Sequence, residues 1–260
     1  MRIVLLGTGS IVPTTERFCS GAYLESGGAK ILVDCGPGII EKLSRVAISP
    51  HKIDAVLLTH YHIDHVSDLL PLIKLRAYGL GGNPDQSPQP LEIMGPPGLH
   101  ELLNHLIDSN SFFEYLRTLM KYQNYTKLTV AEEGRTHSIA GLEVRVLKVP
   151  HDNGVAYKIG DGKKSAVFSG DTAPYPRLAE FAREVDILIH ECSFPAGLLI
   201  GQHTSENDLA EIVAEARPRI VVATHLYPAW QGQEDRLVKA IEKAHECRVI
   251  VGRDMLEIKI

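Results

Sequence analysis

The chain has 260 residues, 44% of them hydrophobic and 23% charged, which is typical of a globular protein with a large core. The formal charge of −5 argues against a broad electrostatic contact with nucleic acid. No apolar stretch is long enough to span a bilayer, so we expect no membrane contact, and four cysteines without C-x-x-C spacing favour free thiols in a reducing cytoplasm.

Short runs rich in Val, Ile and Leu recur along the chain and predict β-strands. The first run, at 2–6, is too short for a signal peptide and fits an opening strand. In chain order the predicted strands cover 2–6, 20–25, 30–34, 54–58, 91–94, 142–149, 154–159, 165–169, 186–190, 219–223 and 248–251.

Apolar residues at helical spacing lie between several of these runs. Ser205 and Asp208 form a capping-box pattern, which predicts the start of a helix. The predicted helices cover 66–73, with a kink at Pro71; 98–123, as two helices broken near 109–111; 205–216, ended by Pro218; and 234–245.

Strands precede helices in the first half of the chain, and the second half repeats this order. The pattern predicts an α/β layered fold. The segment 79–90 is rich in Gly and Pro and reads as a loop rather than a domain boundary. We therefore expect residues 1–260 to form one domain.

Four potential metal ligands lie within six residues, directly after the predicted strand 54–58. His60 and His62 alternate, so they point the same way on an extended backbone, and Asp64 and His65 begin the next helix. Imidazole and carboxylate are ligands that suit zinc. One ion cannot easily use all four groups at this spacing, whereas two neighbouring ions can. Surface or capping roles are the alternative.

This histidine-rich string resembles the metal motif of the metallo-β-lactamase superfamily, and the rest of the chain contains the family's other motifs in order, over essentially its whole length. The resemblance implies an α/β fold of the αββα type, a four-layer sandwich with helices outside two facing sheets. It also assigns a ligand-orienting role to Asp34, the third ligand motif to His151, the bridging position to Asp171 and the last histidine to His225.

The resemblance implies two Zn²⁺ ions, with Mn²⁺ or Fe²⁺ as alternatives. Such a pair lowers the pKa of a shared water and stabilises the attacking and leaving oxygens. The implied arrangement places one ion on His60, His62 and His151, the other on Asp64, His65 and His225, and Asp171 with a hydroxide between them.

A second pair of motifs resembles the ribonuclease Z branch of this superfamily. Glu191 follows the strand 186–190, and His203 precedes the predicted capping box. By this resemblance Glu191 orients His203, and His203 protonates the leaving oxygen; with Asp64 they make up the expected catalytic set. A buried network around Glu191 and an exposed His203 are the alternative. The opening segment 6–10 resembles the same branch.

Two features separate the chain from tRNA-processing ribonuclease Z. That family continues its early motif as Asp-Cys-Gly-Glu-Gly-Thr-Gln, whereas 34–40 reads Asp-Cys-Gly-Pro-Gly-Ile-Ile. Only 152–170 separate His151 from Asp171, which leaves no room for a tRNA-clamping arm. We therefore predict a phosphodiesterase for small phosphodiesters such as cyclic nucleotides, with short RNA still open and a tRNA 3′-processing endonuclease as the alternative.

Other functions remain as rivals. An acyl hydrolase acting on lactones, thioesters or β-lactams would use the same metal centre but would need an oxyanion electrophile more than a general acid. An oxygen- or nitric-oxide-reducing di-iron protein usually carries a glutamate at the position of His62. A non-catalytic binding protein is the least favoured, because all seven ligand positions are present.

Several further residues lie near the predicted ligands in the sequence but belong to no motif. Substrate contact and packing are both open for Tyr61, Asn153, Tyr157 and Tyr227. Histidines without motif context are expected at the surface, and these are His51, His100, His105, His137 and His245. Apolar residues on more than one face of 99–120 favour either a cover over the site or a homodimer contact.

Overall fold

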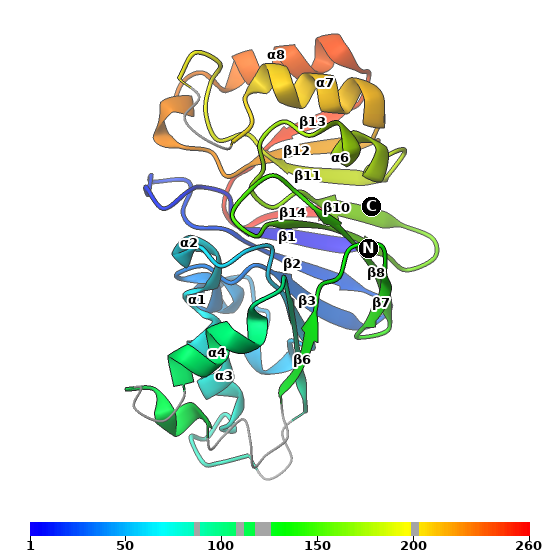
Figure 1. The fold of residues 1–260 in the computed structure, drawn as a ribbon. Coiled ribbons are helices and arrows are strands. Elements are labelled where there is room, and N and C mark those ends of the chain that lie inside the picture. The colour runs from blue at the N-terminus through cyan, green and yellow to red at the C-terminus, as the bar shows by residue number, and fades with distance from the viewer. Residues whose placement is uncertain (86–88, 108–111, 118–125, 199–202) are drawn as a thin grey trace.

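The computed structural model describes residues 1–85, 89–107, 112–117, 126–198 and 203–260. Two sheets of seven strands face each other, and helices cover both outer faces (Figure 1). The four layers confirm the αββα sandwich implied by the sequence. Met1 and Ile260 are joined by a hydrogen bond of 3.0 Å, at the edge of the sandwich opposite α2.

The two sheets have related topologies, each with an antiparallel part and a parallel part. The first is antiparallel from β14 to β3 and parallel from β3 to β6. Its order is β14 (Leu256–Lys259), β1 (Arg2–Gly7), β2 (Gly21–Ser26), β3 (Ala29–Val33), β4 (Ala55–Leu57), β5 (Leu91–Gly95) and β6 (Thr126–Val130).

The second sheet is parallel from β13 to β10 and antiparallel from β10 to β7. Its order is β13 (Arg248–Val251), β12 (Ile220–Thr224), β11 (Ile187–Glu191), β10 (Ser165–Phe168), β9 (Val155–Gly160), β8 (Leu142–Lys148) and β7 (Thr136–Ile139).

The helices divide between the two outer faces (Figure 1). Those of the first sheet are α1 (Ile39–Arg45), α2 (Ile63–Val66), α3 (Leu69–Arg76) and α4 (Leu99–Ile107). Those of the second are α6 (Pro176–Phe181), α7 (Glu206–Ala216) and α8 (Glu234–Ala244). None of the helices in the described ranges is long and apolar enough to cross a membrane.

Alternation along the strands builds the layers. Ile3 and Leu5 of β1 pack between the two sheets, whereas Val4 and Leu6 pack against the helices of the first sheet. A third apolar layer lies between the second sheet and its helices. Because these strands are buried on both faces, they read in the sequence as continuous apolar runs.

The differences from the predicted elements have physical reasons. The strands β6, β7 and β14 were not predicted, and all three lie at sheet edges, where polar residues are tolerated. The helix predicted over 66–73 is interrupted before α3, not at Pro71, because Pro71 sits in the first turn of α3, where its missing N–H costs nothing. In 98–123, α4 is present, while 108–111 and 118–125 lie outside the described residues.

Candidate metal centre

The predicted ligands lie on loops at one edge of the sandwich. β4 leads into 60–65 in the first sheet, and β8, β10 and β12 lead to His151, Asp171 and His225 in the second. Hydrogen bonds between the two sheets hold this edge together. The N–H of Val155 donates to the carbonyl of Thr59 at 2.9 Å, and the hydroxyl of Tyr157 donates to the carbonyl of Leu58 at 2.7 Å.

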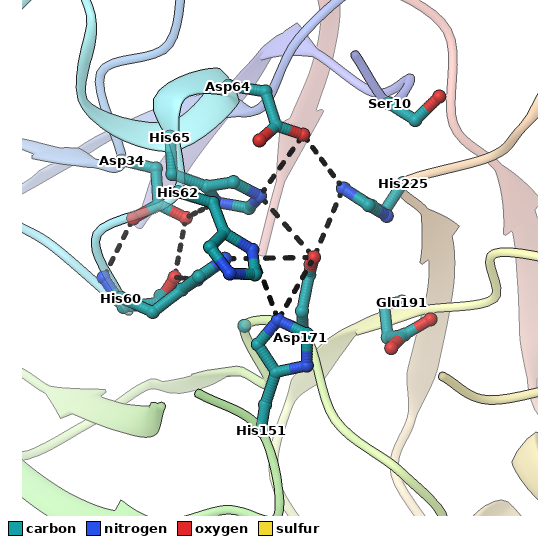
Figure 2. A network of polar contacts seen from close by, with 12 residues as sticks. Ser10, Asp34, His60, His62, Asp64, His65, His151, Asp171, Glu191 and His225 are labelled. Carbon is teal, nitrogen blue, oxygen red and sulfur yellow. Dashed lines mark hydrogen bonds and ion pairs between the residues drawn. The ribbon is translucent and has the colours of Figure 1, made fainter. Parts of the chain in front are cut away.

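One carboxylate oxygen of Asp171 lies at the centre of the cluster (Figure 2). Its Oδ2 is 3.2 Å from Nε2 of His225 and 3.6 Å from Nε2 of His65. The same oxygen is 3.8 Å from Nε2 of His60 and 4.0 Å from Nε2 of His151. Asp171 is thus placed between two groups of histidines.

The remaining groups complete two clusters, one on either side of Asp171. In the first, Nε2 of His151 is 3.3 Å from Nδ1 of His62. In the second, Oδ2 of Asp64 is 3.5 Å from Nε2 of His225 and 3.8 Å from Nε2 of His65. Potential ligand atoms lie within 4.8 Å of one another in the set His60, His62, His151 and Asp171, and in the set Asp64, His65 and His225.

The chemistry of this donor set fits divalent metal ions. The Nε2 atoms of His60, His65 and His225 are buried and have no hydrogen-bond partner, which is costly unless something else binds them. Two ligands bound tetrahedrally at the usual zinc distances lie about 3.3 Å apart. The His62–His151 and His225–Asp171 separations, 3.3 and 3.2 Å, match this value.

In two of the predicted ligand histidines, the opposite ring nitrogen is held by a hydrogen bond. Nδ1 of His65 donates to Oδ2 of Asp34 at 2.7 Å, and Nδ1 of His60 lies 3.0 Å from the hydroxyl of Thr59. Thr59 itself donates to both oxygens of Asp34, at 2.8 and 2.9 Å. These contacts place the ring protons on Nδ1 and leave Nε2 free for a metal.

Two of these residues have a backbone conformation that is uncommon outside glycine. Asp34 has a φ of 60° and His225 a φ of 57°. Hydrogen bonds to neighbouring segments hold both: Asp34 N–H donates to the carbonyl of Leu57 in β4 at 2.8 Å, and Leu226 N–H donates to the carbonyl of Thr8, just after β1, at 2.9 Å. Such strain clusters at functional sites.

Asp254 anchors the β1–β2 loop, which supports His225 through Thr8. Its Oδ1 accepts hydrogen bonds from the N–H and the hydroxyl of Thr8, both at 2.9 Å. Its Oδ2 accepts from the N–H of Phe18 at 3.1 Å and from Lys42 Nζ at 2.5 Å. The C-terminal part of the chain thereby fixes a loop beside the candidate metal centre.

Glu191 is buried beside the cluster and holds His203. Its Oε1 accepts a hydrogen bond from Nδ1 of His203 at 2.9 Å and another from Thr172 N–H at 2.8 Å. The His203 ring lies 5.4 Å from the ring of His151 and 5.7 Å from that of His225, measured between centroids. His203 therefore lies next to one predicted ligand histidine from each side of Asp171.

The charge states follow from burial and from these contacts. Burial opposes ionisation of Asp171, but His225 and His65 beside it hold its pKa well below the usual value. Burial lowers the pKa of His60, which leaves its ring neutral. Burial also opposes protonation of His203, but the hydrogen bond to Glu191 and the negative charges of the nearby carboxylates together raise the pKa of His203.

The centre is open to solvent on the side of His62. The His62 side chain is 43% exposed, and the adjacent Ile63 is 67% exposed. On the inner side, a cavity of about 40 Å³ next to Asp171 has room for a water or two but not for a nucleotide. A substrate must therefore approach from the His62 side.

Of the four residues for which substrate contact and packing were both open, three have a structural role and one stays partly exposed. Tyr157 is fully buried and bonded to the backbone, so it packs. Tyr61 and Asn153 donate to the carbonyls of Pro96 and Pro97 and fix the loop before α4. Tyr227 stays partly exposed and stacks on Phe194, with ring centroids 4.2 Å apart.

One histidine was misplaced and several residues were missed by sequence reasoning. His137 was expected at the surface, but it is buried on β7. Ser193 lies 2.9 Å from the ring of His225, and Asp152 lies 3.2 Å from the ring of His62. Both are next to predicted site residues, which was the only available signal, whereas Asp254 had none.

Comparison with known proteins finds relatives over most of the chain. The family model described as anti-Pycsar protein Apyc1 matches residues 1–244. A ribonuclease Z of Mycobacterium marinum is 30% identical over 286 residues, covering 100% of this chain and 99% of that protein. The sheets and helices also match those of solved structures.

Two solved structures show the likeness in fold. The metallo-β-lactamase fold protein YhfI from Bacillus subtilis aligns with a TM-score of 0.81 and 25% identity, covering 99% of this chain and 98% of that one. The short form of human tRNase Z aligns with a TM-score of 0.70 and 18% identity, covering 100% and 99%.

Proposed function

Because this chain belongs to the family described as anti-Pycsar protein Apyc1 and is a metal-dependent hydrolase of the metallo-β-lactamase fold, we propose that it hydrolyses small phosphodiesters at a dinuclear metal centre. The central position of Asp171, within 4.0 Å of four ring nitrogens, is the observation that carries the proposal. In this proposal residues 1–260 act as one catalytic domain. Homodimer formation stays a prediction.

Two ions are proposed rather than one because of the buried charge. Asp34, Asp64, Asp171 and Glu191 are all buried, and four carboxylates in one site need compensation. Two divalent cations supply it, and nitrogen and oxygen donors suit zinc, with manganese or iron as substitutes. We assign His60, His62 and His151 to one ion, Asp64, His65 and His225 to the other, and Asp171 to both.

When bound, such ions supply a strongly acidified water and neutralise charge on the phosphate. The protein's own contribution to bond cleavage is a proton. His203, held by Glu191 on Nδ1, keeps Nε2 available to protonate the leaving oxygen. Phosphodiester cleavage expels an alkoxide, so a general acid contributes about 10²–10⁴ to the rate. This donor favours a phosphodiester over an acyl substrate.

Small substrates are favoured by the same features that separate the chain from tRNA processing. The segment 152–170 folds as a tight turn, the strands β9 and β10 and the loop to Asp171, without an arm. The net charge of −5 gives little attraction for a folded RNA. Cyclic nucleotides are therefore the proposed class, and short RNA, in keeping with the name of the mycobacterial relative, is the second candidate.

The test is hydrolysis by zinc- or manganese-loaded protein of four substrates: a chromogenic phosphodiester, a cyclic nucleotide, a lactone and a thioester. We expect turnover of the two phosphodiesters and loss of that activity in Asp171→Ala. The matched control is Asp235→Ala, which removes an exposed carboxylate from α8. Turnover of the lactone or thioester alone would assign the centre to an acyl hydrolase, and activity in Asp171→Ala would reject the assigned metal bridge.

A further inference from the structure

The hydroxyl of Ser193 lies between the proposed general acid and a proposed metal ligand. Ser193 is fully buried, and its Oγ is 2.7 Å from Oε2 of Glu191. The same oxygen is 2.9 Å from Nδ1 of His225 and 3.2 Å from Nδ1 of His203. It thus contacts the carboxylate that holds His203 and a histidine on the far side of the site.

The direction of each hydrogen bond follows from counting donors. A serine hydroxyl has one proton and two lone pairs, and an ionised carboxylate only accepts. The Ser193 proton therefore goes to Glu191, which also accepts from Ser193 N–H at 3.1 Å and Thr204 N–H at 3.3 Å on that oxygen. Oγ is then an acceptor for His225, whose proton must be on Nδ1.

This arrangement fixes the tautomer of His225. With the proton on Nδ1, the lone pair of Nε2 points toward Asp64 and Asp171, at 3.5 and 3.2 Å. That Nε2 is buried and without a hydrogen-bond partner. In His65 a carboxylate performs the same task directly, because Nδ1 of His65 donates to Oδ2 of Asp34 at 2.7 Å.

We infer that Ser193 is a positioning residue. It connects Glu191 to His225 through two hydrogen bonds and so fixes Nε2 of His225 as a metal ligand. One carboxylate then serves two tasks: Oε1 holds the general acid His203, and Oε2 acts through Ser193 on the ligand. The general acid and the Asp64–His65–His225 ion are coupled through Glu191. This inference rests on the proposed function, because it takes His225 as a ligand.

The experiment measures metal affinity, not activity. The metal-free full chain is titrated with Zn²⁺ by calorimetry and chelator competition, and His225→Ala identifies the equivalent that this residue binds. Ser193→Ala should lower the affinity for that Zn²⁺ equivalent by about 10–100-fold and leave the affinity for the other equivalent unchanged. Ser193→Thr keeps a hydroxyl and should restore most of the affinity.

Ser26→Ala is the matched control. Ser26 is also buried and also donates to a carboxylate, that of Asp161, at the far end of β2 from the centre. It removes the same kind of hydrogen bond, so it should leave both affinities at the wild-type values. A loss in this variant equal to that of Ser193→Ala would reduce the effect to general destabilisation and overturn the inference.

A double-mutant cycle tests the relay itself. Glu191→Gln should lower the affinity for the Zn²⁺ equivalent that His225 binds in the wild-type background. It should have little further effect on that affinity in Ser193→Ala. Additive losses would overturn the relay. Wild-type affinity for both equivalents in Ser193→Ala, beside a lost equivalent in His225→Ala, would overturn the inference while the proposed metal centre stands. Two intact equivalents in His225→Ala would instead reject the proposed ligand and, with it, the inference.

Discussion

Oε1 of Glu191 and Nδ1 of His203 are 2.9 Å apart, and the carboxylate that makes this contact is almost completely buried. This contact fixes Nδ1 of His203 on Glu191, and the ring lies 5.4 Å from that of His151 and 5.7 Å from that of His225, both proposed ligands. A buried carboxylate behind an imidazole is suited to hold a proton donor near neutral pH.

Replacement of His203 should have an effect that depends on the leaving group. An alkoxide needs a proton as it departs, whereas a nitrophenolate departs without one. We expect His203→Ala to lose about 10²–10⁴ in kcat on a substrate with an alkyl leaving group and far less on a nitrophenyl ester. Steady-state kinetics on a matched pair of esters measures this. Equal losses of kcat on both esters would show that His203 supports the structure or binds metal rather than donating a proton.

The pH profile should report the same residue. Glu191 raises the pKa of His203 against the effect of burial. A general acid acts only below its pKa, so kcat/KM on the alkyl ester should fall as pH rises through the pKa of His203. Glu191→Gln removes the negative charge, lowers that pKa and should move the falling limb to lower pH. The profiles are compared at saturating metal, and a limb that stays or moves to higher pH would contradict this role.

The sequence predicted the local part of the site because strand ends and ligand motifs are adjacent in the chain. His60 to His65 follow β4 directly, and Asp171 and His225 follow β10 and β12. Parallel strands with their carboxyl ends at one edge are enough to bring such residues together. The αββα layering followed from the resemblance, and the continuous apolar runs of two-faced strands agree with it.

Contacts between distant segments were beyond sequence reasoning. Ser193 and His225 are 32 residues apart, and Thr8 and Asp254 are 246 apart, so neither pairing has a local pattern. The direction of a hydrogen bond also depends on which acceptor is already ionised, as at Glu191. The edge strands β6, β7 and β14 were missed because their polar residues interrupt the apolar pattern on which strand prediction depends.

Asp152 should raise the affinity for the ion that we assign to His60, His62 and His151. Its Oδ2 is 3.2 Å from Nε2 of His62, which leaves Nδ1 of His62 to face His151. We expect Asp152→Ala to weaken the equivalent that His62→Ala removes, by about tenfold, the low end for such partners because Asp152 is exposed. Zn²⁺ titration measures it, and the difference should shrink with added salt.

The control for Asp152 is again Asp235→Ala on α8, which removes a charge of the same sign far from the ligands. The free energy of unfolding of the metal-free protein should be the same in both variants to within about 0.5 kcal/mol, as expected for surface changes. An unchanged affinity in Asp152→Ala would show that the contact to His62 has no role in holding the ion.

Gly170 should tolerate no side chain, because it joins β10 to Asp171 at a crowded turn. Its φ is 60°, and a Cβ there would lie 2.8 Å from Cβ of Thr59 and 3.0 Å from the carbonyl of Val155. Gly162 also has a positive φ, of 84°, but a Cβ there meets nothing within 4 Å. The two glycines therefore separate backbone strain from steric conflict.

Gly162→Ala should cost about 1–2 kcal/mol for its backbone alone, and Gly170→Ala a further 1–3 kcal/mol for overpacking. Thermal unfolding of the metal-free variants measures both. Because Asp171 and Thr59 must shift in Gly170→Ala, that variant should also gain less stability from added Zn²⁺ than the wild type, whereas Gly162→Ala should gain the full amount. Equal unfolding temperatures and equal metal responses in the two variants would show that the turn can relax without moving the centre.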